Sequence, residues 1–222
     1  MKGMLIKDFR LLKNQGKTLF LMLLVVAVFM NLLTDVGPSF IVGYITIIFS
    51  MFTVSTISYD EFDNCYLFLM TLPVTRKKYV NEKYLFALLS IIFAWCVGLA
   101  LGTILVVIPS SAAIDAAEWI ETCLGYICTA WIFVGILIPL RLKFESEKAR
   151  YANLIVILGV IIAAFLAASA IEYVPEEIVG TGKQWFSGLG SRGLMVLFVG
   201  ITIAVVIISY LCSQRIMAKK EF

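Results

Sequence analysis

The residues best placed to do chemistry lie in one charged stretch between apolar runs, at positions 59–83. The stretch carries in order the acids Asp60, Glu61 and Asp63, an apolar run that starts at Tyr66, the breaker Pro73 and the bases Arg76 and Lys77. Proline lacks an amide hydrogen and clashes with the preceding turn, so Pro73 ends any helix that reaches it. Thr75 can then cap a second helix that begins at Arg76. A helix, a proline break and a new helix predict a lever that a partner could move.

Several kinds of chemistry are absent from the chain. It contains no histidine, which removes the imidazole-based metal sites and general bases. Gly16-Lys17-Thr18 resembles the end of a phosphate-binding loop, but position 11 is leucine where the first glycine should be. We therefore expect no catalytic, cofactor-binding or metal-binding residue. No charged residue lies in the middle of any predicted span. Ion-coupled transporters usually need such a residue, so this mechanism is disfavoured. Energy for any transport must then come from outside the membrane spans.

The composition is that of an integral membrane protein. Hydrophobic residues make up 61% of the chain and charged residues 15%, against roughly 25% charged residues in ordinary soluble domains. Six apolar runs approach or exceed the roughly 20 helical residues that cross a bilayer. These runs are residues 18–33, 39–58, 84–108, 119–140, 151–171 and 193–212. The expected fold is therefore all-α, a single polytopic transmembrane domain over residues 1–222.

The basic residues predict how this domain is oriented. Sixteen of the eighteen lysines and arginines fall before the first run, in residues 59–83, in residues 141–150 or after the last run. Because positive charge is retained on the cytoplasmic side, both loops and both termini are expected there. We attribute the excess charge to topology and anionic lipid rather than to nucleic acid. Residues 1–17 are expected to form an amphipathic elbow helix at the membrane surface, and the outer segment 172–192 an interfacial or partly re-entrant piece.

Small and hydroxyl residues recur along three of the predicted spans. The sets are Thr46, Ser50 and Thr53 with Thr56; Gly98 and Gly102; and Gly159, Ala163 and Ala167. Such stripes let helices approach closely. The hydroxyl set could form a packing seam or line a substrate path. The glycine pair could pack within one subunit or between two subunits.

Two segments resemble a known family. The first is Tyr59-Asp60-Glu61 with Leu72-Pro73-Val74-Thr75-Arg76-Lys77-Lys78-Tyr79-Val80 and Lys83-Tyr84-Leu85. The second is Pro139-Leu140 with Lys143-Phe144 and Glu147-Lys148-Ala149-Arg150. Both resemble cytoplasmic loops of the six-span permease subunits of type-2 ABC transporters. The similarity is greatest to bacterial permeases of bacteriocin and phenol-soluble-modulin exporters. Glu145 departs from this pattern, because relatives often have glycine there.

The resemblance implies a permease in a bacterial cytoplasmic membrane that exports amphipathic or antimicrobial-type peptides. It also implies a second permease subunit, identical or closely related, and a separate cytoplasmic ATPase that binds ATP and Mg²⁺. The expected coupling residues are Asp60, Glu61, Asp63, Tyr66, Pro73, Arg76, Lys77, Tyr79, Lys143, Glu147 and Arg150. We expect the acids and Tyr66 to form an exposed surface for the ATPase. The alternative is a non-transporting sensor or scaffold that binds a cytoplasmic partner.

Overall fold

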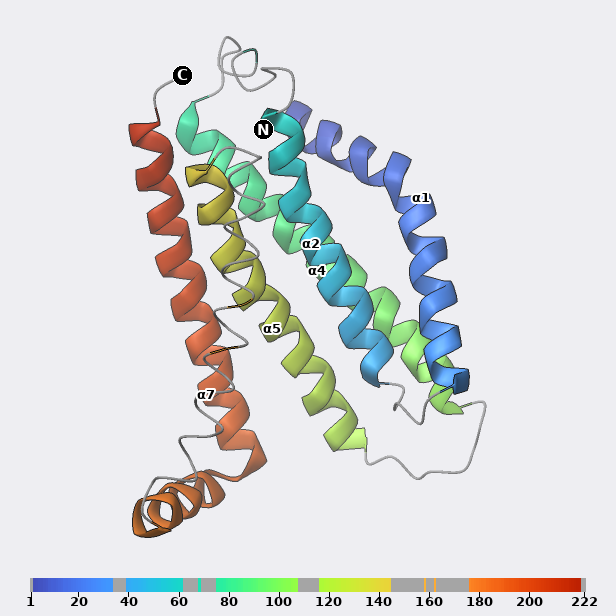
Figure 1. Cartoon of the computed structure of the whole chain (residues 1–222), viewed down its shortest axis with the longest axis vertical. Helices are drawn as coiled ribbons and strands as arrows, with labels where there is room; N and C mark the ends of the chain where they lie inside the picture. The colour runs from blue at the N-terminus through green and yellow to red at the C-terminus, as the bar shows by residue number, and fades with distance from the viewer. Residues whose placement is uncertain are drawn as a thin grey trace.

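The chain folds into a bundle of long helices. The computed structural model describes residues 2–33, 39–61, 68, 75–107, 116–144, 158, 162 and 176–220. In these residues the regular elements are all helical, as expected: α1 (Lys2–Leu33), α2 (Ser39–Glu61), α4 (Arg76–Val107), α5 (Ala116–Lys143) and α7 (Glu176–Lys219). The N and C termini lie at the same end of the bundle (Figure 1). We call this the terminal end and the opposite one the far end.

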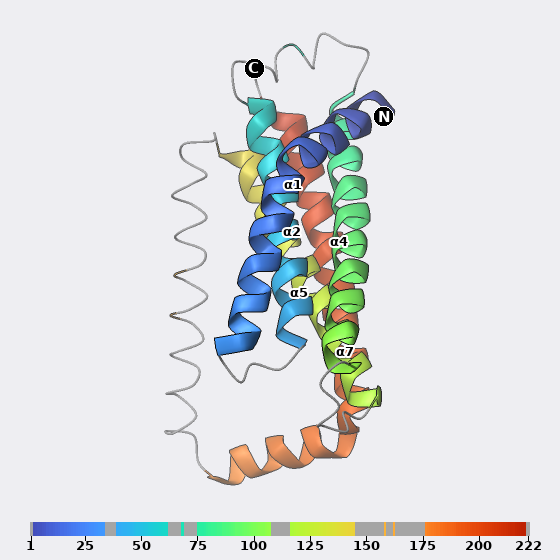
Figure 2. The same ribbon diagram turned by 90° about the vertical axis from the view of Figure 1, so that its right-hand side faces the viewer.

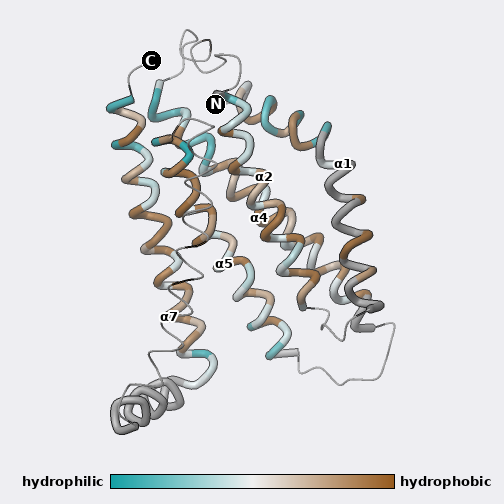
Figure 3. Tube along the Cα trace, viewed as in Figure 1, coloured by the Kyte–Doolittle hydropathy of each residue, from teal (hydrophilic) through white to brown (hydrophobic). Residues whose placement is uncertain are grey.

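Four of the described helices are long and apolar enough to cross a membrane. Figure 3 shows hydrophobic residues along the middle of these helices and more polar residues toward the terminal end. The central helix is α2, because 67% of its apolar window is buried, whereas only 11% of the corresponding window of α7 is buried. Helix α7 therefore lies at the edge of the bundle and presents its apolar side chains outward, as a lipid-facing helix does. The protein is thus a multi-pass membrane protein.

The elbow and the first span form one helix rather than two. Helix α1 runs without interruption from Lys2 to Leu33. Figures 1 and 2 show it bending, so that its first part lies across the terminal end and the rest runs down beside the bundle. Met4 and Asp8 in the first part are buried. The predicted elbow is therefore packed against protein at this end.

The predicted helix start at Arg76 is confirmed. The N–H of Lys78 donates to Oγ1 of Thr75 at 3.3 Å, which is the bond expected of an N-cap residue. The N–H of Tyr79 donates to the Thr75 carbonyl at 3.1 Å. Because α2 continues to Glu61 and α4 begins at Arg76, both helices extend into the segment that was expected to be a loop.

Helix α5 is longer than the fourth span predicted over residues 119–140. It begins at Ala116 and continues through Pro139 to Lys143. Proline offers no N–H to the carbonyl four residues earlier, which belongs to Gly135. Ser209 of α7 donates its hydroxyl hydrogen to that carbonyl. A neighbouring helix therefore supplies the bond that the proline removes, and α5 does not end.

Helix α7 contains a sharp break. Gly190 has φ 63° and ψ 174°, a conformation that glycine adopts readily. Figure 2 shows the residues before Gly190 as a helix running across the far end, with the long final helix rising from the break. This geometry suits the interfacial segment predicted over residues 172–192. All of the fifth predicted span except residues 158 and 162, and residues 145–150 of the second loop, lie outside the described residues. The six-span arrangement therefore stays a prediction.

Candidate functional site

Five charged side chains gather at the terminal end, where α1, α2 and α4 meet. They are Lys7 and Asp8 of α1, Asp60 of α2, and Glu82 and Lys83 of α4. We call them the charge cluster. Four of the five side chains are at most 2% exposed, and Lys7 is 31% exposed. The elbow thus meets the last turn of α2 and the second turn of α4 through buried charge.

Lys83 is the centre of the charge cluster. Its Nζ lies 2.5 Å from Oδ2 of Asp8 and 2.7 Å from Oδ2 of Asp60. It also donates to Oγ1 of Thr56 at 3.3 Å. The Tyr79 ring centroid lies 5.4 Å from the same nitrogen, close enough for a cation–π attraction. One ammonium group therefore joins three helices.

Asp60 has three partners. Besides Lys83, it accepts a hydrogen bond from the Tyr79 hydroxyl at 3.0 Å and pairs with Lys7. Because an isolated buried carboxylate is costly, Asp60 needs these donors. Removing any of them leaves charge that the surroundings compensate less well.

Glu82 is the exception in the charge cluster. Its side chain is fully buried, and neither carboxylate oxygen has a hydrogen-bond partner among the described residues. The nearest cation is Lys83, whose Nζ lies 3.9 Å from Oε2. In the same part of the chain, Oδ1 of Asp8 also lacks a hydrogen bond. Among the described residues, three carboxylates therefore face two ammonium groups, and some carboxylate oxygens have no donor.

This arrangement is suited to transmitting movement between the three helices. A buried ion pair resists separation, because pulling the partners apart leaves uncompensated charge. Displacing the ends of α2 and α4 would therefore displace the elbow as well. Within the described ranges, no group of three or more histidine, cysteine, aspartate or glutamate residues could hold a metal ion.

The structure corrects the position of Asp60, one of the acids expected on an exposed surface. Asp60 is only 2% exposed, and Tyr79, a predicted coupling residue that binds it, is fully buried. The reason is that Lys7 and Lys83 draw Asp60 inward, and Tyr79 follows as a hydrogen-bond donor. Their coupling role stays a prediction.

The other predicted coupling residues differ in position. Arg76 donates from Nη1 to the carbonyls of Ala218 at 2.8 Å and Met217 at 3.4 Å, so it binds the end of α7. Lys77 and Lys143 are exposed. Outside the described residues lie the side chain of Glu61 and all of Asp63, Tyr66, Pro73, Glu147 and Arg150.

The predicted packing residues on α2 face other helices. Thr46, Ser50, Thr53 and Thr56 are buried, and the Thr53 hydroxyl lies 2.6 Å from that of Ser90 on α4. This placement favours a packing seam over a substrate path.

The glycine pair on α4 packs within the subunit. A Cβ at Gly98 would lie 3.1 Å from Cα of Val42, and one at Gly102 would lie 3.0 Å from Cγ2 of Val42. The third stripe, Gly159, Ala163 and Ala167, lies outside the described residues.

A second polar network joins α4, α5 and α7 and was not predicted. The hydroxyl of Tyr84 lies 2.5 Å from that of Ser209 and 2.9 Å from that of Ser213. Since Ser209 gives its hydrogen to Gly135, Tyr84 donates to Ser209, and Ser213 donates to Tyr84. Tyr210 and Gln214 donate to Oδ1 of Asn81 nearby. The recurrence of Ser209, Tyr210 and Ser213 on one stretch of α7 was the available sequence signal.

The signal for the charge cluster was weaker. Asp8 falls four residues after Met4, on the apolar face of the elbow, and an acid on a buried face calls for a partner. The partner itself, Lys83, could not be identified from spacing, because it lies 75 positions away.

Comparison with known proteins identifies the family. Residues 3–218 match the family model described as ABC-2 family transporter protein. No curated protein and no solved structure matches the chain. The match covers nearly all of the described helices, including all five residues of the charge cluster. This chain therefore belongs to the ABC-2 family of transporter proteins.

Proposed function

We propose that the chain is the permease subunit of an ATP-driven exporter whose ATPase is a separate cytoplasmic protein. The observation that carries this proposal is the family match over residues 3–218. It agrees with the sequence, which has spans but no nucleotide-binding motif. ATP and Mg²⁺ would bind to the ATPase, and two permease subunits would together form the path of the cargo across the membrane.

The terminal end is the place where the ATPase would act. The positive charge in the sequence predicts that this end lies in the cytoplasm, and Lys77 is exposed there. The charge cluster lies directly inside, joining the elbow to the helix ends on either side of residues 62–74. A push on that segment would reach α2, α4 and the elbow together, because Lys83 binds all three helices.

The cargo we propose is an amphipathic peptide. The described spans carry no charged residue between Tyr84 and Val107 of α4, or between Gly193 and Gln214 of α7. Such surroundings suit a solute with one apolar face better than an ion. A bacterial cytoplasmic membrane is the setting implied by the resemblance.

The test is transport by the purified complex. The chain is reconstituted into proteoliposomes with a candidate ATPase, and ATP-dependent movement of a fluorescent amphipathic helical peptide is measured. A scrambled peptide without an apolar face and a hydrolysis-deficient ATPase are the controls. We expect flux only with the amphipathic peptide and the active ATPase. Stable ATPase binding without any flux would instead support a sensor or scaffold, and flux without any ATPase would contradict the proposal.

A further inference from the structure

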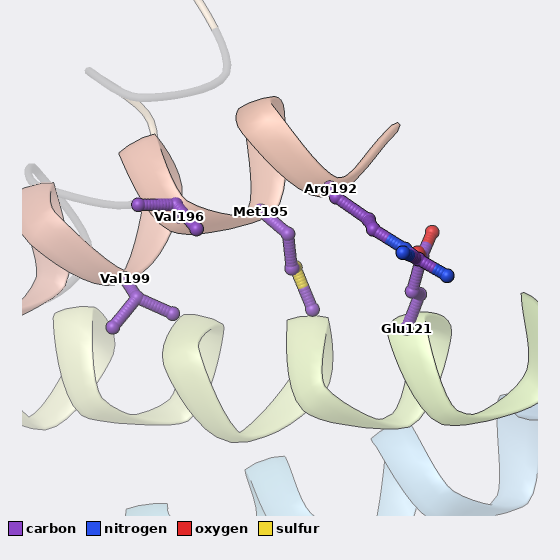
Figure 4. A pocket seen from close by; sticks show the side chains of 5 residues that line it. All are labelled: Glu121, Arg192, Met195, Val196 and Val199. Carbon is purple, nitrogen blue, oxygen red and sulfur yellow. The ribbon is translucent and has the colours of Figure 1, made fainter. Parts of the chain in front are cut away.

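A pocket lies between α5 and α7 at the far end, away from the charge cluster. Glu121, Arg192, Met195, Val196 and Val199 line it, and its volume is about 320 Å³. Figure 4 shows Met195, Val196 and Val199 following one another along α7, with Arg192 and Glu121 reaching the same end of the pocket. The pocket thus has apolar walls and two opposite charges at one end.

The two charges are available to a ligand. Arg192 is exposed, and it has no hydrogen-bond or ion-pair partner within the described ranges. Glu121 accepts one hydrogen bond, from Oγ of Ser191 at 3.3 Å. An unpaired guanidinium beside a carboxylate with free lone pairs is suited to a ligand that carries both a negative and a positive group.

The apolar part of the pocket continues onto the surface of the bundle. Val196 is 73% exposed and Val199 is 39% exposed. Ile203 and Ile207 are also more than half exposed on the same helix. An apolar chain that entered the pocket could therefore extend along α7 toward the middle of the bundle.

We propose that this pocket binds a phospholipid whose head group carries a phosphate and a protonated primary amine. Arg192 binds the phosphate, since guanidinium groups recognise it with paired hydrogen bonds. Glu121 accepts hydrogen bonds from the ammonium group, and one acyl chain lies against Val196 and Val199. A purely anionic head group would meet the Glu121 carboxylate, and a purely cationic one would meet Arg192. Charge complementarity therefore selects the zwitterion.

The test compares head groups on the full-length chain. The protein is purified in detergent, mixed with phosphatidylethanolamine or phosphatidylglycerol of identical acyl chains, and examined by native mass spectrometry for retained lipid. We expect phosphatidylethanolamine to be retained about tenfold more strongly, which corresponds to one or two charge-assisted hydrogen bonds. Equal retention of the two lipids by the unaltered chain overturns the proposal.

Variants assign the two head-group contacts. Arg192→Gln should lower phosphatidylethanolamine retention about tenfold, whereas Glu121→Gln should remove the preference over phosphatidylglycerol. Arg215→Gln, an exposed arginine at the other end of α7, is the matched control and should change neither value. An unchanged preference in both pocket variants overturns the assignment.

Labelling then distinguishes lipid from protein as the occupant. In a chain whose native cysteines are replaced, Val196→Cys should react with a maleimide in lipid-free detergent and be protected by added phosphatidylethanolamine. Protection in lipid-free detergent would show that another part of this chain, or a second copy, fills the pocket, and would overturn the proposal.

Discussion

Ser209 on α7 donates its hydroxyl hydrogen to the carbonyl oxygen of Gly135 on α5. That carbonyl has no intrahelical partner, because Pro139 stands where the donor should be. The helices are close at this point, since a Cβ at Gly135 would lie 3.4 Å from Cγ1 of Val205. The continuity of α5 toward the terminal end therefore depends on α7.

This relationship predicts non-additive effects on stability. Ser209→Ala should lower the free energy of unfolding by about 1–2 kcal/mol, because a buried carbonyl loses its donor. In a Pro139→Ala background the helix supplies its own N–H, so the same change should cost less by about 1 kcal/mol. The free energy of unfolding is measured in mixed detergent micelles for the unaltered chain, the two single variants and the double variant. Equal costs in both backgrounds would show that the hydroxyl does not replace the missing amide.

Lys83 should be the most important cation of the charge cluster for stability. Lys83→Met removes the common partner of Asp8 and Asp60, and we expect a loss of about 3–5 kcal/mol in the free energy of unfolding. Lys7→Met should cost less, about 1 kcal/mol, since the partly exposed Lys7 pair is screened by water. Lys78→Met, an exposed lysine on the same helix, serves as the control. A loss of similar size in all three variants would refute a central role for Lys83.

Glu82 should respond in the opposite direction from Asp60. Glu82→Gln keeps the shape of the side chain and removes a buried carboxylate to which no described residue donates a hydrogen bond. We expect unfolding to become harder by about 1 kcal/mol, because less charge is desolvated. Asp60→Asn should make unfolding easier, since it weakens the pairs to Lys7 and Lys83. Thermal unfolding in one detergent, followed by tryptophan fluorescence, compares the two variants. Destabilisation by Glu82→Gln would mean that this carboxylate is held by attractive contacts.

The helices themselves were predictable because their causes are local. An apolar run of about 20 residues identifies a span whatever surrounds it, and the Thr75 cap depends on residues three apart in sequence. The start of α4 was therefore predicted at the correct residue. The end of α5 was not, because Ser209, which compensates Pro139, lies on another helix.

The charge cluster could not be predicted in full either, because its contacts join residues that are far apart in the sequence. Sequence reasoning placed Asp60 in the right region, beside the loop, but on an exposed surface. Its burial depends on Lys83 and on Lys7 in the elbow, 53 positions away. Nothing in the spacing of these residues distinguishes a buried pair from two solvated charges. The location of the charged residues was predictable from one sequence, and their partners were not.

The close approach of α4 to α2 gives a test of packing. Gly98→Ala places a Cβ 3.1 Å from the backbone of Val42, which cannot easily move, and we expect a loss of about 1–3 kcal/mol in the free energy of unfolding. Gly125→Ala is the matched control, because no atom of the described residues lies within 4 Å of its added Cβ. It should be neutral or stabilising by up to about 1 kcal/mol, since alanine favours the helix. If Gly98→Ala were equally harmless, α2 and α4 would have to separate readily.

Variants at Arg76 and Lys77 can distinguish an effect on docking of the proposed ATPase from an effect on folding of the permease. Arg76 holds the carbonyls of Met217 and Ala218, so Arg76→Glu should loosen α4 from α7 and lower stability by about 1–3 kcal/mol. Lys77 is exposed, so Lys77→Glu should leave the unfolding temperature unchanged. If the ATPase docks here, Lys77→Glu should still weaken its association, because a charge on the docking surface is reversed. Pull-down of the ATPase and thermal unfolding are measured on the same preparations, with Arg215→Glu, a reversal of an exposed arginine on α7, as a charge-matched control. Wild-type association by Lys77→Glu would place the docking surface elsewhere on the terminal end, whereas weakened association with unchanged unfolding would locate it at the first turn of α4.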